Sequence, residues 1–104
     1  MRGTLRQAGE IVDIDCRLSW VDALLREAVG AHLEASRPSG ATVSLIVEES
    51  SAPFTDAGWE PAGRGAWMRP GEVVLENACT SGFDLRLRAE GEMLSVLARW
   101  RPQT

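Results

Sequence analysis

The chain contains no lysine, and all eleven of its basic side chains are arginines. A phosphate-binding loop of the GxxxxGKS or GxxxxGKT kind requires a lysine, so ATP binding in that manner is excluded. The formal net charge of −4 argues against a nucleic-acid partner, because a protein that holds a phosphate backbone needs a basic surface. The charge is uneven, however, since residues 64–104 carry six arginines against five acids. A local basic face in this C-terminal part therefore remains open.

Long apolar runs are also missing. The longest contain three residues, such as residues 45–47, whereas a membrane-spanning helix needs roughly 20. The opening stretch MRGTLRQAGE has no apolar core that could serve as a signal peptide. We therefore expect no membrane partner and a cytoplasmic location.

Cysteine and histidine are scarce. The two cysteines, Cys16 and Cys79, do not have the spacing of a metal site, and His32 is the only histidine. In a cytoplasmic protein both thiols are expected to be reduced and to act as small hydrophobic side chains. The sequence predicts no metal site and no cofactor.

Length and composition indicate a single domain over residues 1–104. This length is near the common domain size, and 44% of the residues are hydrophobic. Residues 1–8 precede the first periodic segment, and we expect them to be flexible.

Three segments in the first half of the chain show clear periodicity. In residues 10–18 apolar side chains alternate with charged ones, as in a strand with one buried face. Residues 19–35 carry apolar side chains at helical spacing, and Ser19 with Asp22 resembles a capping box. Residues 42–48 alternate again and are rich in β-branched side chains. The order predicted here is strand, helix, strand.

The C-terminal third predicts a β-hairpin. The runs FDLRLRA and EMLSVLARW alternate apolar and polar residues, and a two-residue turn of Glu90 and Gly91 can join them. That register sets apolar side chains opposite apolar ones along both strands, and a slip of one residue would destroy the match. The preceding run EVVLENA supplies a third strand to the same apolar face.

These elements predict an α+β fold, a two-layer sandwich in which one main helix packs on a mostly antiparallel sheet of five or six strands. The expected element order is β-α-β-β-β-β, with one further short edge strand allowed at GAWMR. An edge strand of this kind could pair with its copy, so a homodimer remains open.

A long irregular connection is expected over residues 50–71. It contains three of the five prolines, together with Trp59 and Trp67. Long connections in compact domains are often functional, and tryptophan is enriched in binding hot spots. Trp59 and Trp67 are therefore candidate binding residues, with burial in the core as the alternative. Trp20 and Trp100 are expected in the core or at its rim.

The stretch ENACTSGFD brings Cys79 close to Asp84 in sequence and raises the question of a catalytic nucleophile. A nucleophilic cysteine needs a base or a cationic neighbour, and His32 is the only histidine that could serve. The Thr-Ser-Gly in the middle favours a turn, which is the preferred interpretation. We therefore predict no catalytic residue, and if the protein is an enzyme, Cys79, His32 and Asp84 are the candidates.

Arginines line the polar face of the predicted hairpin. Arg86, Arg88 and Arg99 could form a solvated, salt-bridged sheet surface with Glu76 and Glu90. The alternative is a face that recognises an acidic partner or a phosphate group. On this alternative the three arginines are candidate binding residues.

The chain resembles, from TVSLIVEES through GAWMRPGEVVLENACTSGFDLRLRAEGEMLSVLARWRP, the N-terminal region that precedes the kinase domain in some bacterial HPr-kinase-related proteins. The likeness covers roughly residues 41–102 and lies in strand order and general texture, without an invariant motif. It implies a bacterial, non-catalytic domain that positions or regulates something else. Kinase activity is not implied, because the nucleotide-binding half is lacking here.

Two functions are consistent with these observations. Our prediction is a non-catalytic, regulatory module that binds another protein or domain through residues 50–71 and the outer face of the hairpin. The alternative is a small enzyme or ligand carrier, cyclase-like, in which helix and sheet enclose a Trp-lined apolar pocket for a small molecule. Binding is preferred because no catalytic group is assembled in the sequence, whereas aromatic and arginine-rich segments are present.

Overall fold

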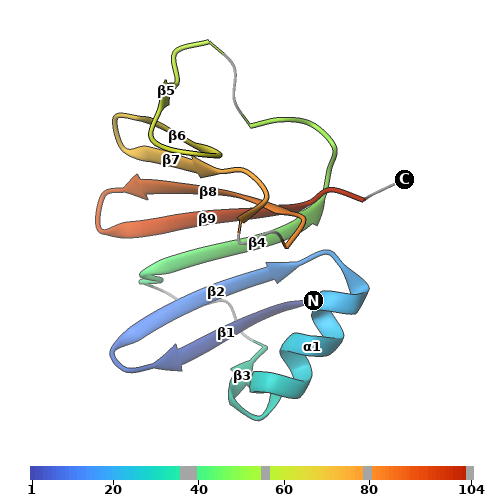
Figure 1. The fold of residues 1–104 in the computed structure, drawn as a ribbon. Coiled ribbons are helices and arrows are strands. Elements are labelled where there is room, and N and C mark those ends of the chain that lie inside the picture. Colours follow the sequence, from blue (N-terminus) through green and yellow to red (C-terminus); the bar gives the residue numbers. More distant parts are fainter. Residues whose placement is uncertain (36–39, 55–56, 79–80, 103–104) are drawn as a thin grey trace.

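The computed structural model describes residues 1–35, 40–54, 57–78 and 81–102 and contains one large sheet and one helix (Figure 1). The strands are β1 (Arg2–Gln7), β2 (Glu10–Cys16), β3 (Leu33–Glu34), β4 (Val43–Glu49), β5 (Glu60–Pro61), β6 (Ala66–Arg69), β7 (Glu72–Leu75), β8 (Phe83–Glu90) and β9 (Met93–Trp100). The helix is α1 (Ser19–Val29), which a 3-10 turn η1 (Gly30–His32) extends. All nine strands belong to a single mixed sheet of order β3-β1-β2-β4-β9-β8-β7-β6-β5.

The expected two-layer sandwich with five or six strands is therefore wrong. Residues 2–7 form β1 rather than flexible chain, and β5 and β6 lie inside the segment expected to be irregular. In β1 the buried positions are Gly3 and Thr4, so the alternation of apolar side chains that would reveal a strand is absent. The strands β3 and β5 have two residues each, too few to show any period.

The sheet is rich in antiparallel pairs but contains two parallel ones. The chain runs from β2 through α1 into β4, which pairs with β2 in parallel, as a strand-helix-strand crossover requires. It then re-enters the sheet at the far edge as β5 and returns strand by strand to β9, which pairs with the other side of β4 (Figure 1). The long connection after β4 exists because the chain must cross the whole C-terminal half of the sheet.

The predicted C-terminal hairpin is present, with its turn one residue later than expected. The loop is Gly91-Glu92, and Leu87 pairs with Val96 instead of Leu94. Gly91 has φ +62°, which suits the first loop position of a type II′ turn. A shift of pairing by two residues leaves every side chain on the same face, so alternation alone could not distinguish the two registers.

The helix is shorter than its periodicity suggested. α1 ends at Val29, and its N-cap is Leu18, with no side-chain hydrogen bond to the first turn. The capping-box interpretation of Ser19 and Asp22 is thus wrong, because Ser19 is already the first helical residue. In the part of the chain that the structure describes, no helix has the length and apolarity needed to cross a membrane.

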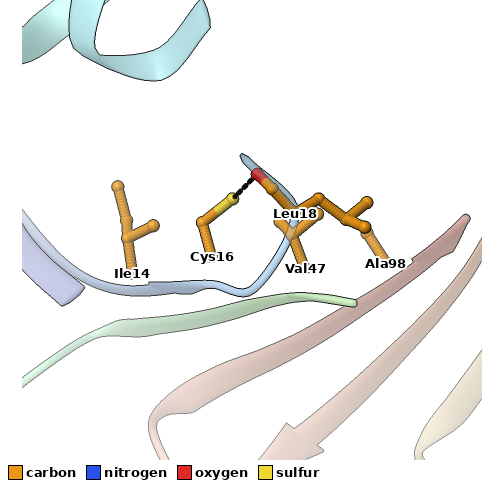
Figure 2. Close-up of a cluster of buried hydrophobic side chains, with 5 residues drawn as sticks. All are labelled: Ile14, Cys16, Leu18, Val47 and Ala98. Atoms are coloured by element: carbon orange, nitrogen blue, oxygen red, sulfur yellow. Dashed lines mark hydrogen bonds between the residues drawn. The ribbon is translucent and has the colours of Figure 1, made fainter. Parts of the chain in front are cut away.

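The core lies between α1 and the N-terminal half of the sheet (Figure 2). Its fully buried members are Ile14, Cys16, Leu18, Val47 and Ala98. Val21 and Leu25 of α1 pack against this cluster, and we call this side of the sheet the helix face. Cys16 acts as the small hydrophobic side chain expected, and its Sγ donates a hydrogen bond to the Leu18 carbonyl oxygen at 3.4 Å.

The turn between β1 and β2 offers a test of the fold. Ala8 and Gly9 form a two-residue loop with φ +53° and +80°, the backbone of a type I′ turn, in which an alanine is strained. Asparagine tolerates this conformation, so Ala8→Asn should raise the free energy of unfolding by about 0.5–1 kcal/mol. Urea unfolding of the Ala8→Asn variant and the wild type measures this difference in the free energy of unfolding. Ala62→Asn, at an exposed position with negative φ, should give no gain, and an equal gain in both variants would contradict the assigned turn.

Candidate functional site

Asp84, one of the candidate catalytic residues, is part of a buried clamp. Its side chain is 2% exposed and accepts two hydrogen bonds from the Arg101 guanidinium, both 2.8 Å, and one from the Asn77 backbone N–H at 2.9 Å. The bond to Asp84 raises the pKa of Arg101. Asn77 Oδ1 in turn accepts a hydrogen bond from the Gly82 N–H at 2.7 Å. The clamp ties β8 to the connection that follows β7. Both carboxylate oxygens of Asp84 accept hydrogen bonds within it.

The structure does not bring His32 close to Asp84. His32 is exposed in η1, just before β3, and four strands separate β3 from β8, which carries Asp84. The third candidate, Cys79, lies outside the described residues. Among the described residues, no group of three or more His, Cys, Asp and Glu could hold a metal ion.

Trp59 and Trp67 pack onto the sheet instead of projecting from it. Both are half-buried. The Trp59 ring lies 4.1 Å from the Arg69 guanidinium carbon, and Trp67 pairs with the fully buried Val74 of β7. The connection that carries Trp59 thus covers the side of the sheet opposite the helix face.

The same side carries a row of arginines, which we call the arginine face and define as Arg69, Arg86, Arg88 and Arg99. They come from β6, β8 and β9, so the prediction that the hairpin arginines share a polar face is confirmed. Phe54, from the connection after β4, lies over it, with its ring 4.3 Å from the Arg99 guanidinium carbon and 5.6 Å from that of Arg86. The Arg99 guanidinium also donates to the Ala52 carbonyl oxygen at 3.4 Å.

The ion pairs on the arginine face differ from those expected. Glu72, which the sequence analysis did not select, lies 3.1 Å from Arg69 and 3.3 Å from Arg88. Glu48 binds Arg99 at 3.0 Å. Of the two expected partners, Glu90 does meet the arginine face, 3.7 Å from Arg88, whereas Glu76 lies 3.9 Å from Arg101. The strand register decides which glutamate lies beside which arginine, and the sequence alone did not determine that register.

A second surface lies on the helix face, beyond the reach of α1. We call it the open face and define it as Met68, Val73, Leu87, Ala89 and Leu94, which line a shallow hollow of about 290 Å³. Met68 is 46% exposed and Leu94 37%. Alternation placed these residues on the apolar side of their strands, but it could not reveal that the helix would leave them uncovered.

The helix meets β8 and β9 at the end of the hairpin away from the open face, where Phe83 pairs with Trp100. Trp20 of α1 contacts Phe83 and Trp100, with ring centroids 5.9 and 5.2 Å apart, so its side of the helix is turned toward β8 and β9. Leu24 lies one turn along the same side. Trp20 is 45% exposed and Leu24 55%. Leu94 precedes Trp100 by six residues on β9, about 20 Å along the strand, so Trp20 and Leu24 are exposed apolar residues apart from the open face.

No family model, no curated protein and no solved structure matches this chain. The resemblance to HPr-kinase-related proteins therefore stays a prediction.

The Asp84 clamp predicts a structural effect for Asp84→Asn. This change keeps the shape of the side chain but removes the charge that binds Arg101. Hydrogen bonds to charged groups are worth about 1.5–3 kcal/mol, so we expect a loss of this size in the free energy of unfolding. Urea unfolding at neutral pH measures it, and Glu10→Gln at an exposed site is the control. Stability equal to that of the wild type would refute the clamp.

The ion pairs of Glu72 predict a pH dependence. Burial raises the pKa of Glu72, but the hydrogen bonds and charges of Arg69 and Arg88 outweigh burial and hold that pKa below its usual value. The resulting stabilisation is complete above the unfolded-state pKa, about 4.3, and is lost as pH falls through the lower folded-state pKa. Glu72→Gln should therefore lose less stability between pH 7 and about pH 3 than the wild type. Urea unfolding at both pH values tests this, and Glu92→Gln should behave like the wild type.

Proposed function

We propose that this chain is a non-catalytic module that binds another protein or domain through the open face. The observation that carries the proposal is the single helix on a nine-stranded sheet. The molecule is 39 Å along its longest axis, whereas a helix with its side chains is about 10 Å across. Apolar side chains consequently remain uncovered on β6 to β9, and contiguous exposed apolar patches mark interaction sites.

The shape of the surface favours an amphipathic helix as the partner element. Both edge strands, β3 and β5, have only two residues, which leaves little backbone for an added strand. An exposed apolar sheet surface suits the apolar side of an amphipathic helix, which would lie across Met68, Val73 and Leu94.

The alternative of a ligand carrier has less support. The space between α1 and the sheet is filled by the core cluster. Four cavities among the described residues have volumes of about 230–410 Å³, and none of these four is lined by tryptophan. A regulatory role in the bacterial cytoplasm belongs to the same proposal and rests on the sequence alone.

Photo-crosslinking tests the proposal. A photoreactive amino acid at position 68 or 94, incorporated in the source cell, should capture the same protein from both positions, through a helical segment of it. The same photoreactive amino acid at exposed position 64 should not capture that protein. With that protein purified, Leu94→Glu should weaken binding at least tenfold, because burying a leucine contributes about 1.5–3 kcal/mol.

Gln7→Glu is the matched control, since it adds the same charge at an exposed site on β1 and should leave affinity unchanged. Capture of only a second copy of this chain would contradict the proposed partner. An unchanged affinity of the Leu94→Glu variant for the captured protein would also contradict the proposal.

A further inference from the structure

Arg86 differs from the other three arginines of the arginine face, because it alone forms no ion pair with a carboxylate. Arg69 and Arg88 share Glu72, and Arg99 binds Glu48. Among the described residues, Arg86 forms neither an ion pair nor a side-chain hydrogen bond. Three carboxylates, those of Glu72, Glu90 and Glu48, thus serve the other three arginines.

The surroundings of Arg86 make this isolation unfavourable. It is half-buried, and its neighbours across the sheet are the apolar Val74 on β7 and Leu97 on β9. The Phe54 ring covers another side. Burial lowers the pKa of Arg86 and the charge of Arg88 lowers it further, and the charges of Glu72 and Glu90 offset this only in part. A partly buried charge without a direct ion-pair partner is costly, so a site of this kind attracts an anion.

A second unsatisfied donor lies on the same strand. Arg88 Nε is buried and has no hydrogen-bond partner. Arg86 and Arg88 are two residues apart on one face of β8, which is about 7 Å along a strand. Buried donors without partners are rare in proteins and call for an explanation. Here they indicate that donors exceed acceptors around Arg86.

We infer that Arg86 binds a carboxylate group supplied by another molecule. One negative charge balances the one arginine that lacks a partner, and the planar guanidinium fork matches the geometry of a carboxylate. A doubly charged phosphate fits less well, because the negative charges of Glu72 and Glu90 already act on Arg86 and would repel the additional charge. The group can come from a small carboxylic acid or from an acidic side chain of a peptide.

The site is independent of the proposed function. Arg86 points to the side of the sheet opposite Leu87 of the open face, since successive residues of a strand alternate. Binding at one face can therefore fail while binding at the other is observed.

Nuclear magnetic resonance of the arginine Nε–Hε groups tests the inference. Sodium acetate is titrated into the full chain in exchange for sodium chloride at constant ionic strength, which keeps general screening unchanged. We expect a saturable shift of the Arg86 signal. In Arg86→Gln, backbone amides around β8 report the same titration, and binding should be at least tenfold weaker. Arg86→Lys keeps the charge but loses the planar guanidinium fork. Its affinity for acetate should therefore lie between that of Arg86→Gln and that of the wild type.

Arg64→Gln is the matched control. Arg64 is exposed and, like Arg86, has no ion pair within the described ranges, so acetate affinity should equal that of the wild type. Arg86→Gln removes a charge without a partner and is expected to fold, which thermal unfolding verifies.

Two further titrations define the ligand. Tighter binding of acetyl-Ala-Asp-Ala-amide than of acetate identifies a peptide acid as the source, and equal or weaker binding identifies a free carboxylic acid. Tighter binding of sulfate than of acetate would overturn the carboxylate assignment. A linear response that persists in Arg86→Gln would overturn the site itself.

Discussion

The apolar face of a nine-stranded sheet is wider than one helix can cover, and most other features of this protein follow from that mismatch. α1 is committed to the N-terminal half by the parallel crossover between β2 and β4, and it buries Ile14, Cys16 and Val47 there. The strands that follow have no helix of their own, because they are joined by short turns. Ala98 is buried at the end of β9 that α1 reaches, where Trp20 also contacts Phe83 and Trp100. Met68 and Leu94, farther from the helix, remain exposed.

The opposite side of the same strands is covered by different means. The connection after β4 must reach β5 at the far edge, and on its way it lays Phe54 and Trp59 over the arginine face. Arginine suits this position because its methylene groups cover neighbouring apolar side chains while its guanidinium stacks on aromatic rings. The segment that the sequence predicted as an irregular loop therefore contributes β5 and β6 to the sheet and packs Phe54 and Trp59 on one side of it.

The sequence revealed those features that depend only on which face a side chain occupies. Alternation identified β2, β4, β8 and β9 and put Arg86, Arg88 and Arg99 on one side. It failed wherever the answer depended on register or on distant contacts. A two-residue shift in pairing preserves the faces but changes the partners, so Glu72 and not Glu76 meets Arg88.

Strand β1 and the open face escaped prediction for related reasons. The strand β1 buries Gly3 and Thr4, whose burial depends on pairing with β2 and not on their own hydrophobicity. The open face has the same alternating pattern as a covered strand, because the pattern records which side is apolar and not what packs on it. The isolation of Arg86 was likewise invisible, since it follows from the positions of two glutamates on other strands.

The two faces of the C-terminal strands differ in a way that bears on association. A sheet with apolar side chains exposed on both sides would stack on its copies without limit, whereas charges on one side restrict packing to the other. Here Arg86, Arg88 and Arg99 line one side, and the open face forms the other. The two-residue edge strands add to this restriction, because they discourage pairing edge to edge. An apolar partner is thereby directed to the open face, and a ligand of opposite charge to the arginine face.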